Sequence, residues 1–408
     1  DVYFDLYTQS GRSAILPNKL TSTWGINQSF LGVTLRANKG DNVHINVTNK
    51  LNETTTLHWH GMKLPAKADG GPHQPIEPNT TWLSEFKIEQ DAATLWYHSH
   101  QLHKTAEQVY QGLAGVFIID DEKSKSLNLP SEYGVDDLPV IIQDKDFSYS
   151  GNFIYLGGRM MSNMMGKRGQ TVLVNGAINP ALKAKKSLLR LRLLNGSNAR
   201  TYHLQFDDRR DFYIIGSDGG LLEQSQKVNI ISLAPAERAE ILLDVADGGM
   251  PILQHQAKHE SNAGMGMMRR MMGRDSDLDV FQIDATNAEK STRGVPSQLT
   301  THPKISASMV DKQRLMVLQM RMGPQMMFGG DAFSINGKTM DISRIDEVVK
   351  AGSVEVWTIE NDSMMPHPFH IHNVQFKIIM RKSGIKGHEL GFKDVVLVQP
   401  NERVQVVM

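Results

Sequence analysis

Apolar and polar residues alternate along several short stretches of the chain, with the period of two that is typical of half-buried β-strands. The clearest examples lie at residues 43–47, 189–193 and 354–356. Turn residues separate such runs, which favours β-sandwiches over alternating strand–helix units. The pattern therefore predicts an all-β protein.

The three alternating stretches also share a common ending, since each closes at an asparagine: Asn49, Asn195 and Asn361. Related segments precede them ("WGINQSF", "LVNGAINP", "FSINGKTM"), and a second set follows ("EPNTTWLSEF", "APAERAEILLDV", "QPNERVQVVM"). Such self-similarity indicates a repeated structural unit. We therefore predict three copies of one β-rich domain, at residues 1–125, 136–285 and 300–408, with residues 284–303 as the second linker.

Composition excludes several classes of protein. The 408 residues contain 44 Lys and Arg and 44 Asp and Glu, so no global field favours nucleic acid or an anionic membrane. No run approaches the roughly 18 apolar residues of a membrane span. The absence of cysteine from the sequence rules out disulfides, thiolate zinc sites and cysteine catalysis within these residues.

Six of the 15 histidines occur in three His-x-His pairs, "HWHG", "HSH" and "HIH". On a strand, residues i and i+2 share a face about 6.6 Å apart, which suits two imidazoles on adjacent metal ions better than chelation of one ion. All-imidazole ligation is compatible with copper, zinc, iron or nickel. We predict one shared metal cluster from the three pairs, which are His58 and His60, His98 and His100, and His370 and His372.

The repeat aligns two of these pairs. His58 follows Asn49 by nine positions, and His370 follows Asn361 by the same nine. The middle copy has only His203 in the equivalent stretch, "TYHLQF". We therefore expect the first and third copies to carry the chemistry and the middle copy to act as a spacer that holds them together.

Two further residues lie close to these motifs. His367 precedes His370 by three positions, so on a continuous strand it faces the opposite way and should serve a second site. In "DGGPHQPI", Gly70 and Gly71 permit a tight turn that aims Asp69 at the cluster, where a carboxylate can relay protons to bound oxygen. An ordinary turn aspartate fits the same residues.

Fourteen of the 22 methionines fall in four patches among Gly, Arg, Ser and Asn, whereas core methionine is scattered among Leu, Ile and Val. Thioethers are soft ligands that select Cu(I) over Zn²⁺. A flexible hydrophobic interaction surface is the other interpretation. Methionine therefore favours copper, and the patches comprise Met160, Met161, Met164 and Met165; Met265, Met267, Met268, Met271 and Met272; Met322, Met326 and Met327; and Met364 and Met365 beside His367.

With these residues in hand, the chain resembles the multicopper oxidases, and most closely the bacterial periplasmic copper-efflux (cuprous) oxidases. The resemblance spans nearly the whole chain. It rests on "HWHG", "DGGP", "YHSHQ…GLAGVFIIDD", "NGAINP…LRLRLLNGSNAR", "IIGSDGGLL" and "MMPHPFHIHNVQF". It implies three cupredoxin-like, Greek-key β-sandwich domains.

The resemblance also implies roles for individual residues. His58 and His370 would bind the type 2 copper, and His367 the type 1 copper. The type 3 pair would be held by His60, His98, His100 and His372. Asp69 matches the family's acidic residue near the trinuclear site. Cu(I) captured as substrate would meet a set of methionines and one acid: Met265, Met267, Met268, Met271, Met272, Asp362, Met364 and Met365.

One motif of the family is absent. It is His-Cys-His followed by a further His and a Met, which supplies the type 1 cysteine, histidine and methionine and one more histidine for each type 3 copper. Pro78 precedes His98 by 20 positions, so the repeat places the missing motif about 20 positions past Pro400, near position 420. We therefore expect the sequence to stop before its natural end, at Met408, with the third domain truncated.

Three functions compete at this stage. The first is a laccase-like copper oxidase of copper tolerance, which couples one-electron oxidation of Cu(I), or of phenolic substrates, to four-electron reduction of O₂ to water. The second is a redox-inactive copper-sequestering protein, if the chain truly ends at Met408. The third is a copper-free scaffold, as in some cell-division proteins that resemble this family; seven retained ligand histidines argue against it.

The resemblance also sets the expected surroundings of the protein. The sequence begins at Asp1, which fits a secreted protein that has lost its signal peptide and equally a sequence that lacks its first residues. We expect a periplasmic monomer that meets O₂ and Cu(I) ions or small reducing substrates.

Overall fold

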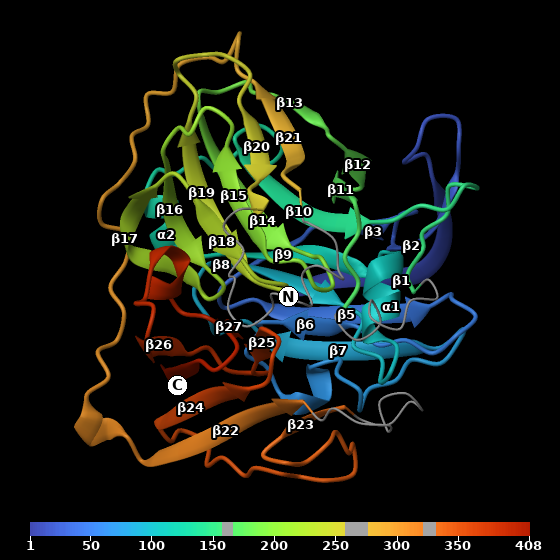
Figure 1. The fold of residues 1–408 in the computed structure, drawn as a ribbon, viewed down its shortest axis with the longest axis vertical. Helices are drawn as coiled ribbons and strands as arrows, with labels where there is room; N and C mark the ends of the chain where they lie inside the picture. The colour runs from blue at the N-terminus through green and yellow to red at the C-terminus, as the bar shows by residue number, and fades with distance from the viewer. Residues whose placement is uncertain (157–165, 258–275, 321–331) are drawn as a thin grey trace.

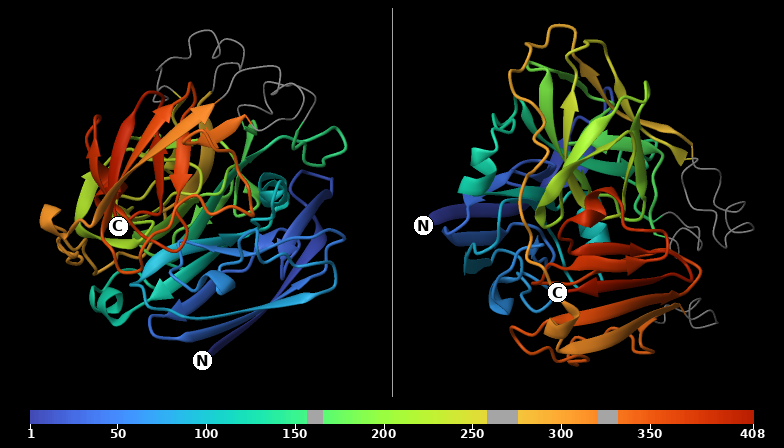
Figure 2. Two further views of the ribbon diagram at one scale, coloured as in Figure 1. Left: turned by 90° about the horizontal axis from the view of Figure 1, so that it is seen from below. Right: turned by 90° about the vertical axis from the view of Figure 1, so that its left-hand side faces the viewer.

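The computed structural model describes residues 1–156, 166–257, 276–320 and 332–408. Its strands form three β-sandwiches in chain order, blue to cyan, green to yellow and orange to red in Figure 1. Figure 2 shows the same sandwiches from two further sides. The predicted all-β class is confirmed, whereas the domain limits drawn from the sequence stay a prediction.

The first sandwich packs the sheet β3-β2-β1-β5-β7 on the sheet β4-β9-β8-β6. Helix α1 and a 3₁₀ turn connect its strands, and helix α2 follows its last strand. The elements are β1 (Val2–Ser13), β2 (Thr21–Ile26), β3 (Leu31–Gly32), β4 (Leu35–Asn38), β5 (Asn42–Asn49), β6 (His58–His60), η1 (Ala66–Ala68), β7 (Thr81–Lys87), β8 (Ala93–His98), α1 (Thr105–Gln111), β9 (Ala114–Asp120) and α2 (Glu122–Ser126).

The second sandwich packs the sheet β12-β11-β10-β14-β19-β16-β17 on the sheet β13-β21-β20-β15-β18. Its strands are β10 (Asp137–Lys145), β11 (Thr171–Val174), β12 (Ala177–Ile178), β13 (Ala181–Lys183), β14 (Leu188–Asn195), β15 (Tyr202–Phe206), β16 (Phe212–Ser217), β17 (Gly220–Val228), β18 (Ile231–Leu233), β19 (Arg238–Asp244), β20 (Ile252–His255) and β21 (Leu278–Asp284).

The third sandwich combines the sheet β23-β22-β24-β28-β26 with the strand pair β25-β27. Its elements are η3 (Ala307–Met309), β22 (Lys312–Met320), β23 (Phe333–Ile335), β24 (Glu355–Asp362), β25 (His367–His370), β26 (Lys377–Arg381), η4 (Gly387–Leu390), β27 (Val395–Val398) and β28 (Arg403–Val407).

The sequence repeat corresponds to a repeated strand arrangement. In each sandwich the strand with the recurrent asparagine at its end, or one residue before it, pairs in parallel with one neighbour and antiparallel with the other. The triplets are β1-β5-β7, β10-β14-β19 and β22-β24-β28. Three copies of one folding unit therefore underlie the three alternating stretches of sequence.

The recurrent asparagines explain why each of these strands ends where it does. Asn49, Asn195 and Asn361 are fully buried. Each side-chain amide donates to two backbone carbonyls, and each side-chain oxygen accepts from the backbone N–H two residues later. One side chain thus satisfies backbone groups that the departing loop would otherwise leave unpaired in the interior.

Apolar contacts join the first two sandwiches into one body. One buried cluster combines Trp96 and Ile118 of the first sandwich with Ile141, Leu173 and Leu194 of the second. Each sandwich also has a core of its own. The outer face of β8 therefore packs against the second sandwich. This contact fixes the strand that ends at His98.

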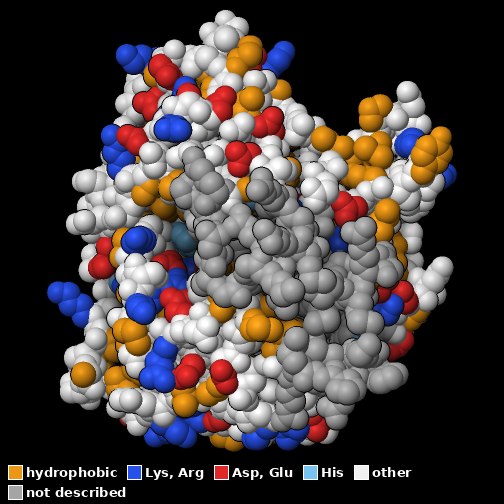
Figure 3. All heavy atoms as spheres, viewed as in Figure 1, with side chains coloured by type: hydrophobic (Ala, Val, Ile, Leu, Met, Phe, Trp, Pro, Cys, Tyr) orange, Lys and Arg blue, Asp and Glu red, His pale blue; other side chains and the backbone are white. Residues whose placement is uncertain are grey.

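The described surface agrees with the balanced composition. Lys and Arg side chains intermingle with Asp and Glu on the face drawn in Figure 3. Among the helices of the described residues, none is long and apolar enough to cross a membrane.

Replacement of the buried asparagine in the middle sandwich, N195A, should destabilise the fold. It leaves two carbonyls and one N–H without partners, at a cost of about 2 kcal/mol, which lowers the Tm of a 408-residue chain by about 2 °C. Calorimetry measures the shift. The exposed Asn287 gives the control N287A, and equal Tm values for both variants would contradict the assigned role.

Candidate metal centre

Six histidines converge where the first and third sandwiches meet, near β6 and β25 in the middle of Figure 1. The rings of His58 and His372 stack with centroids 4.0 Å apart, and those of His60 and His370 with centroids 3.7 Å apart. His100 adds an edge contact with His372 at 5.0 Å. His98 completes the group, with its ring centroid 5.5 Å from that of His58. The three sequence pairs therefore form one cluster.

In the first sandwich, strand alternation selects which side chains enter this cluster. Trp59 points into the core of the sandwich, where its indole N–H donates to Ser84 Oγ at 3.0 Å. Its neighbours His58 and His60 consequently point to the opposite face. The pairing of β6 with β8 sets His58 directly across from His98.

The third sandwich repeats this local design. Ile371 packs against the apolar core of the sandwich, so His370 and His372 on either side of it point toward the first sandwich. The main-chain N–H of Leu64 donates to the side chain of Asn373 at 2.9 Å, which ties the two sandwiches together beside the cluster.

Asp69 holds one histidine from each sandwich. Its backbone carbonyl accepts from His58 Nδ1 at 2.9 Å, and its carboxylate Oδ2 accepts from His372 Nδ1 at 2.9 Å. Gly70 makes the turn possible, because its φ is +72° and a Cβ there would lie 1.8 Å from the Leu57 carbonyl oxygen. Gly70 thus permits the turn in which Asp69 contacts both histidines, and its role in proton transfer stays a prediction.

Sequence reasoning missed a second aspartate at the cluster, Asp394. Its backbone carbonyl accepts from His370 Nδ1 at 2.8 Å, and its carboxylate lies 3.2 Å from His60 Nε2. Asp394 is fully buried and follows the equally buried Lys393, directly before the apolar strand β27. The sequence did contain one signal for this residue, because the charged pair of Lys393 and Asp394 directly precedes an apolar strand.

The unpartnered nitrogens of the cluster fit a metal site. His58 Nε2, His100 Nδ1 and His370 Nε2 are buried without a hydrogen-bond partner. A buried polar atom without a partner costs about 1–3 kcal/mol, and metal coordination would remove that cost. The structure also brings donor atoms of two sets within 4.8 Å of one another, His58, His60 and His370, and His58, Asp69 and His372.

His60 gives a further indication of a cation. A neutral imidazole has one N–H, and His60 presents one nitrogen to Asp394 and the other to His98 Nε2, 3.1 Å away. His98 already donates its own N–H from Nδ1 to the Ser99 carbonyl. When His60 donates to Asp394, two ring lone pairs therefore face each other, and a bound cation would stabilise that arrangement.

Burial keeps the cluster in the protonation state that metals require. It lowers the pKa of His58, His60 and His98 below the ordinary range, that of His100 to about 4 and that of His370 to about 3. These imidazoles are therefore neutral near pH 7, with lone pairs available as ligands. Burial by itself raises the pKa of Asp69, but hydrogen bonds with His372 and His58 outweigh that effect and hold the carboxylate ionised.

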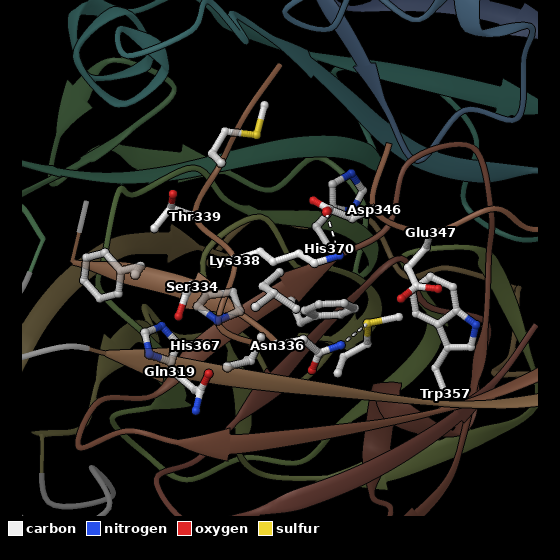
Figure 4. Close-up of a pocket in the computed structure, with 17 residues that line it drawn as sticks. Gln319, Ser334, Asn336, Lys338, Thr339, Asp346, Glu347, Trp357, His367 and His370 are labelled. Carbon is white, nitrogen blue, oxygen red and sulfur yellow. Dashed lines mark hydrogen bonds and ion pairs between the residues drawn. The ribbon is translucent and has the colours of Figure 1, made fainter. Parts of the chain in front are cut away.

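His367 packs apart from the six clustered rings. Its Nε2 is 2.8 Å from Ser363 Oγ, and its ring packs edge-on against Phe333. It borders a cavity of about 560 Å³ within the third sandwich. Figure 4 shows His367 at one end of this cavity, beside Ser334 and Gln319.

The residues proposed to meet Cu(I) are only partly within the described chain. Met265, Met267, Met268, Met271 and Met272 lie outside the described residues, as do the patches at 160–165 and 322–327. Asp362 is exposed, and Met364 is 42% exposed, so both are accessible to an incoming ion. Met365 is buried, 8% exposed, although it precedes His367 by only two residues.

Comparison with known proteins identifies the family. A profile described as multicopper oxidase matches residues 8–124 and, in a second form, residues 308–408. The multicopper oxidase mco of Staphylococcus haemolyticus is 39% identical over 99% of this chain and 81% of its own length. This chain belongs to the multicopper oxidase family. The three sandwiches are accordingly cupredoxin-like.

Two other relatives delimit what membership implies. The solved structure of a laccase-like multicopper oxidase, CueO, from Ochrobactrum sp. superposes with a TM-score of 0.88 at 31% identity, over 99% of this chain and 89% of that one. The cell division protein FtsP of Escherichia coli K12 is 35% identical over 96% of this chain and 80% of its own length. The family therefore includes copper oxidases and a cell-division protein.

Acid should destabilise the metal-free protein through the clustered histidines. An unfolded histidine titrates near pH 6.5, well above the folded values of about 4 for His100 and about 3 for His370. Between these values the unfolded chain binds more protons than the folded chain. The contribution of these imidazoles to the free energy of unfolding is therefore complete above about pH 6.5 and is lost progressively as pH drops towards 4.

Urea unfolding of the metal-free chain from pH 7 to pH 4 measures this slope. The variant H100Q/H370Q lacks two of the titrating groups, so its stability should vary less steeply with pH. An unchanged slope in the variant would show that these imidazoles do not titrate as their burial implies.

Proposed function

We propose that this chain forms the trinuclear copper centre of an oxidase that couples one-electron oxidation of Cu(I), or of phenols, to four-electron reduction of O₂ to water. The supporting observation is the cluster of six buried imidazoles from two sandwiches, with three ring nitrogens that have no protein partner. Neutral imidazole is a good copper ligand. Family membership supplies the reaction class.

The histidines divide into candidate ligand groups. His58 and His370, whose Nε2 atoms are unpartnered, would hold a type 2 copper. The contacts of His60 with His98, and of His100 with His372, match the two halves of a type 3 pair. Copper bound there would supply the electron transfers to O₂. The protein groups fix the imidazoles, and burial limits access of bulk water.

Asp69 is the candidate proton carrier. Its Oδ2 accepts from His372 Nδ1 at 2.9 Å, whereas its buried Oδ1 makes no hydrogen bond and lies 3.3 Å from His58 Nδ1. Reduction of O₂ to water consumes protons, and an ionised carboxylate can accept a proton at Oδ1 and pass it on.

Electron entry separates the oxidase from a second candidate function. Blue-copper sites depend on a cysteine thiolate, and the 408 residues contain no cysteine. His367 is the single candidate type 1 ligand that the resemblance assigns in this sequence. Copper binding without turnover, as in a sequestering protein, is therefore the second candidate. A copper-free scaffold, the third, accounts for neither the convergence of the histidines nor their unpartnered nitrogens.

We also propose the setting of this activity. Exposed Asp362 and Met364 would receive Cu(I) as substrate beside His367. The expected location is the periplasm, where a copper oxidase would contribute to copper tolerance. We expect a monomer without a nucleic-acid partner.

Copper counting combined with oxygen uptake distinguishes the three candidates. The chain is reconstituted with copper, its copper content is measured, and an oxygen electrode records uptake when Cu(I) is added. Oxygen uptake supports the oxidase; copper binding without uptake identifies a sequestering protein; no bound copper identifies a scaffold.

The variant H58Q/H370Q should bind at least one copper fewer per chain. The control H203Q alters a histidine of the middle sandwich, outside the cluster of six, and should bind as much copper as the unchanged protein.

Replacement of the proposed proton carrier, D69N, should slow oxygen reduction while copper stays bound. The amide oxygen can still accept from His372, but the side chain no longer takes up a proton. Loss of general acid–base catalysis typically costs about 10²–10⁴-fold in rate. Oxygen uptake from pH 5 to pH 8 measures the effect, and an unchanged rate and pH profile would identify Asp69 as an ordinary turn residue.

A further inference from the structure

The two aspartates at the cluster make reciprocal contacts. Asp69, from the first sandwich, holds His58 of its own sandwich with its carbonyl and His372 of the third with its carboxylate. Asp394, from the third sandwich, holds His370 of its own sandwich with its carbonyl and approaches His60 of the first with its carboxylate. Each aspartate therefore spans the interface.

The backbone carbonyls of the two aspartates also make equivalent contacts. The Asp69 carbonyl also faces the N–H of Trp59 at 3.3 Å, and the Asp394 carbonyl faces the N–H of Ile371 at 3.2 Å. Trp59 and Ile371 are the central residues of the two His-x-His segments. The segments that carry Asp69 and Asp394 thus support the two His-x-His segments in the same way.

The carboxylates differ in how firmly they are held. Asp69 is partly exposed, and its Oδ1 makes no hydrogen bond, although His58 Nδ1 lies 3.3 Å away. Asp394 is fully buried, and both of its oxygens accept from Arg238, Oδ1 from Nη1 at 2.7 Å and Oδ2 from Nη2 at 2.5 Å. A bidentate guanidinium–carboxylate pair fixes both distance and plane. Asp394 is therefore built to hold a position, whereas Asp69 can exchange a proton.

Arg238 comes from the middle sandwich and is itself fixed there. Its backbone N–H donates to Asp218 at 2.8 Å, and the neighbouring Glu237 contacts Lys393 at 2.8 Å. Lys393 also contacts Asp218 at 2.8 Å. These side chains are all buried. The middle sandwich thus holds the turn of the third sandwich that carries Asp394.

The glycine of the "HWHG" motif fits this arrangement. Gly61 has a φ of +84°, and a Cβ there would lie 2.4 Å from Asp394 Oδ2 and 2.7 Å from Arg238 Nη2. Any larger residue would displace the pair. The motif of the first sandwich is therefore shaped around a carboxylate from the third sandwich and a guanidinium from the second.

We propose that Asp394 is a positioning residue of the copper centre, fixed by Arg238, and that it orients His60 through its carboxylate and His370 through its carbonyl. The inference rests on the proposed function. It gives the middle sandwich a role beyond that of the spacer expected from the sequence, because all three sandwiches then contribute to the geometry of one centre. Groups that orient metal-binding imidazoles influence metal affinity as well as activity.

Copper affinity of the variant D394N tests this role. The amide keeps the shape of the side chain and the backbone carbonyl at His370, but removes the charge that faces His60. Competition with a copper chelator should show affinity for part of the bound copper weakened about 10–100-fold. Circular dichroism and thermal unfolding of the metal-free variant establish that it is folded.

The variant D137N is the matched control. Asp137 is equally buried and forms a bidentate pair with an arginine, Arg192, but it contacts none of the six histidines. The proposal expects unweakened copper binding in D137N. Equal affinities in D394N and the unchanged protein, or the same loss in both variants, would overturn it.

Two further outcomes have a defined meaning. If D394N does not fold, D394E replaces it; this variant keeps the charge but lengthens the side chain, and unweakened copper binding in D394E would overturn the proposal. If the unchanged protein binds no copper, the proposed function itself fails. A loss confined to D394N supports the positioning role.

Discussion

The candidate metal centre depends on hydrogen bonds that cross the interface between the first and third sandwiches. The carboxylates of Asp69 and Asp394 each reach a histidine of the opposite sandwich, at 2.9 Å from His372 Nδ1 and 3.2 Å from His60 Nε2. Together with the hydrogen bond from Leu64 to Asn373, these contacts set the separation of imidazoles that come from different sandwiches. With them, six rings meet in one buried space.

Burial imposes a condition on this arrangement. Imidazoles removed from water are held neutral, and buried ring nitrogens without partners carry a free-energy cost. A protein without a ligand for them would be expected to replace such residues with apolar ones. Metal coordination explains their presence in this member of the multicopper oxidase family.

The middle sandwich shows how a domain without clustered histidines can still shape the centre. Arg238 pairs with Asp394, and the buried Asp218, Glu237 and Lys393 hold both in place. On the other side, Trp96 of β8 belongs to the apolar cluster shared with the second sandwich and stacks on His98 at 4.0 Å between ring centroids. The second sandwich therefore supports strands or turns from both of the others.

Much of the fold could be predicted from the sequence, because its signals are local. Alternation marked the strands, the asparagines at 49, 195 and 361 marked the repeat, and i, i+2 spacing placed each pair of histidines on one face. A matching position in the repeat then linked the first and third copies. These inferences need only the geometry of a strand and the comparison of one segment with another.

The sequence by itself thus determined the all-β architecture and singled out the six histidines of the cluster, whereas it left the role of Asp69 open. Only the tertiary structure decided which imidazoles stack, which nitrogens have no partner, and that Asp394 and Arg238 belong to the same site. Those two residues are 156 positions apart in the chain, and no local pattern connects them. Their partnership arises because the folded sandwiches bring distant charges together in an interior where each charge requires a partner.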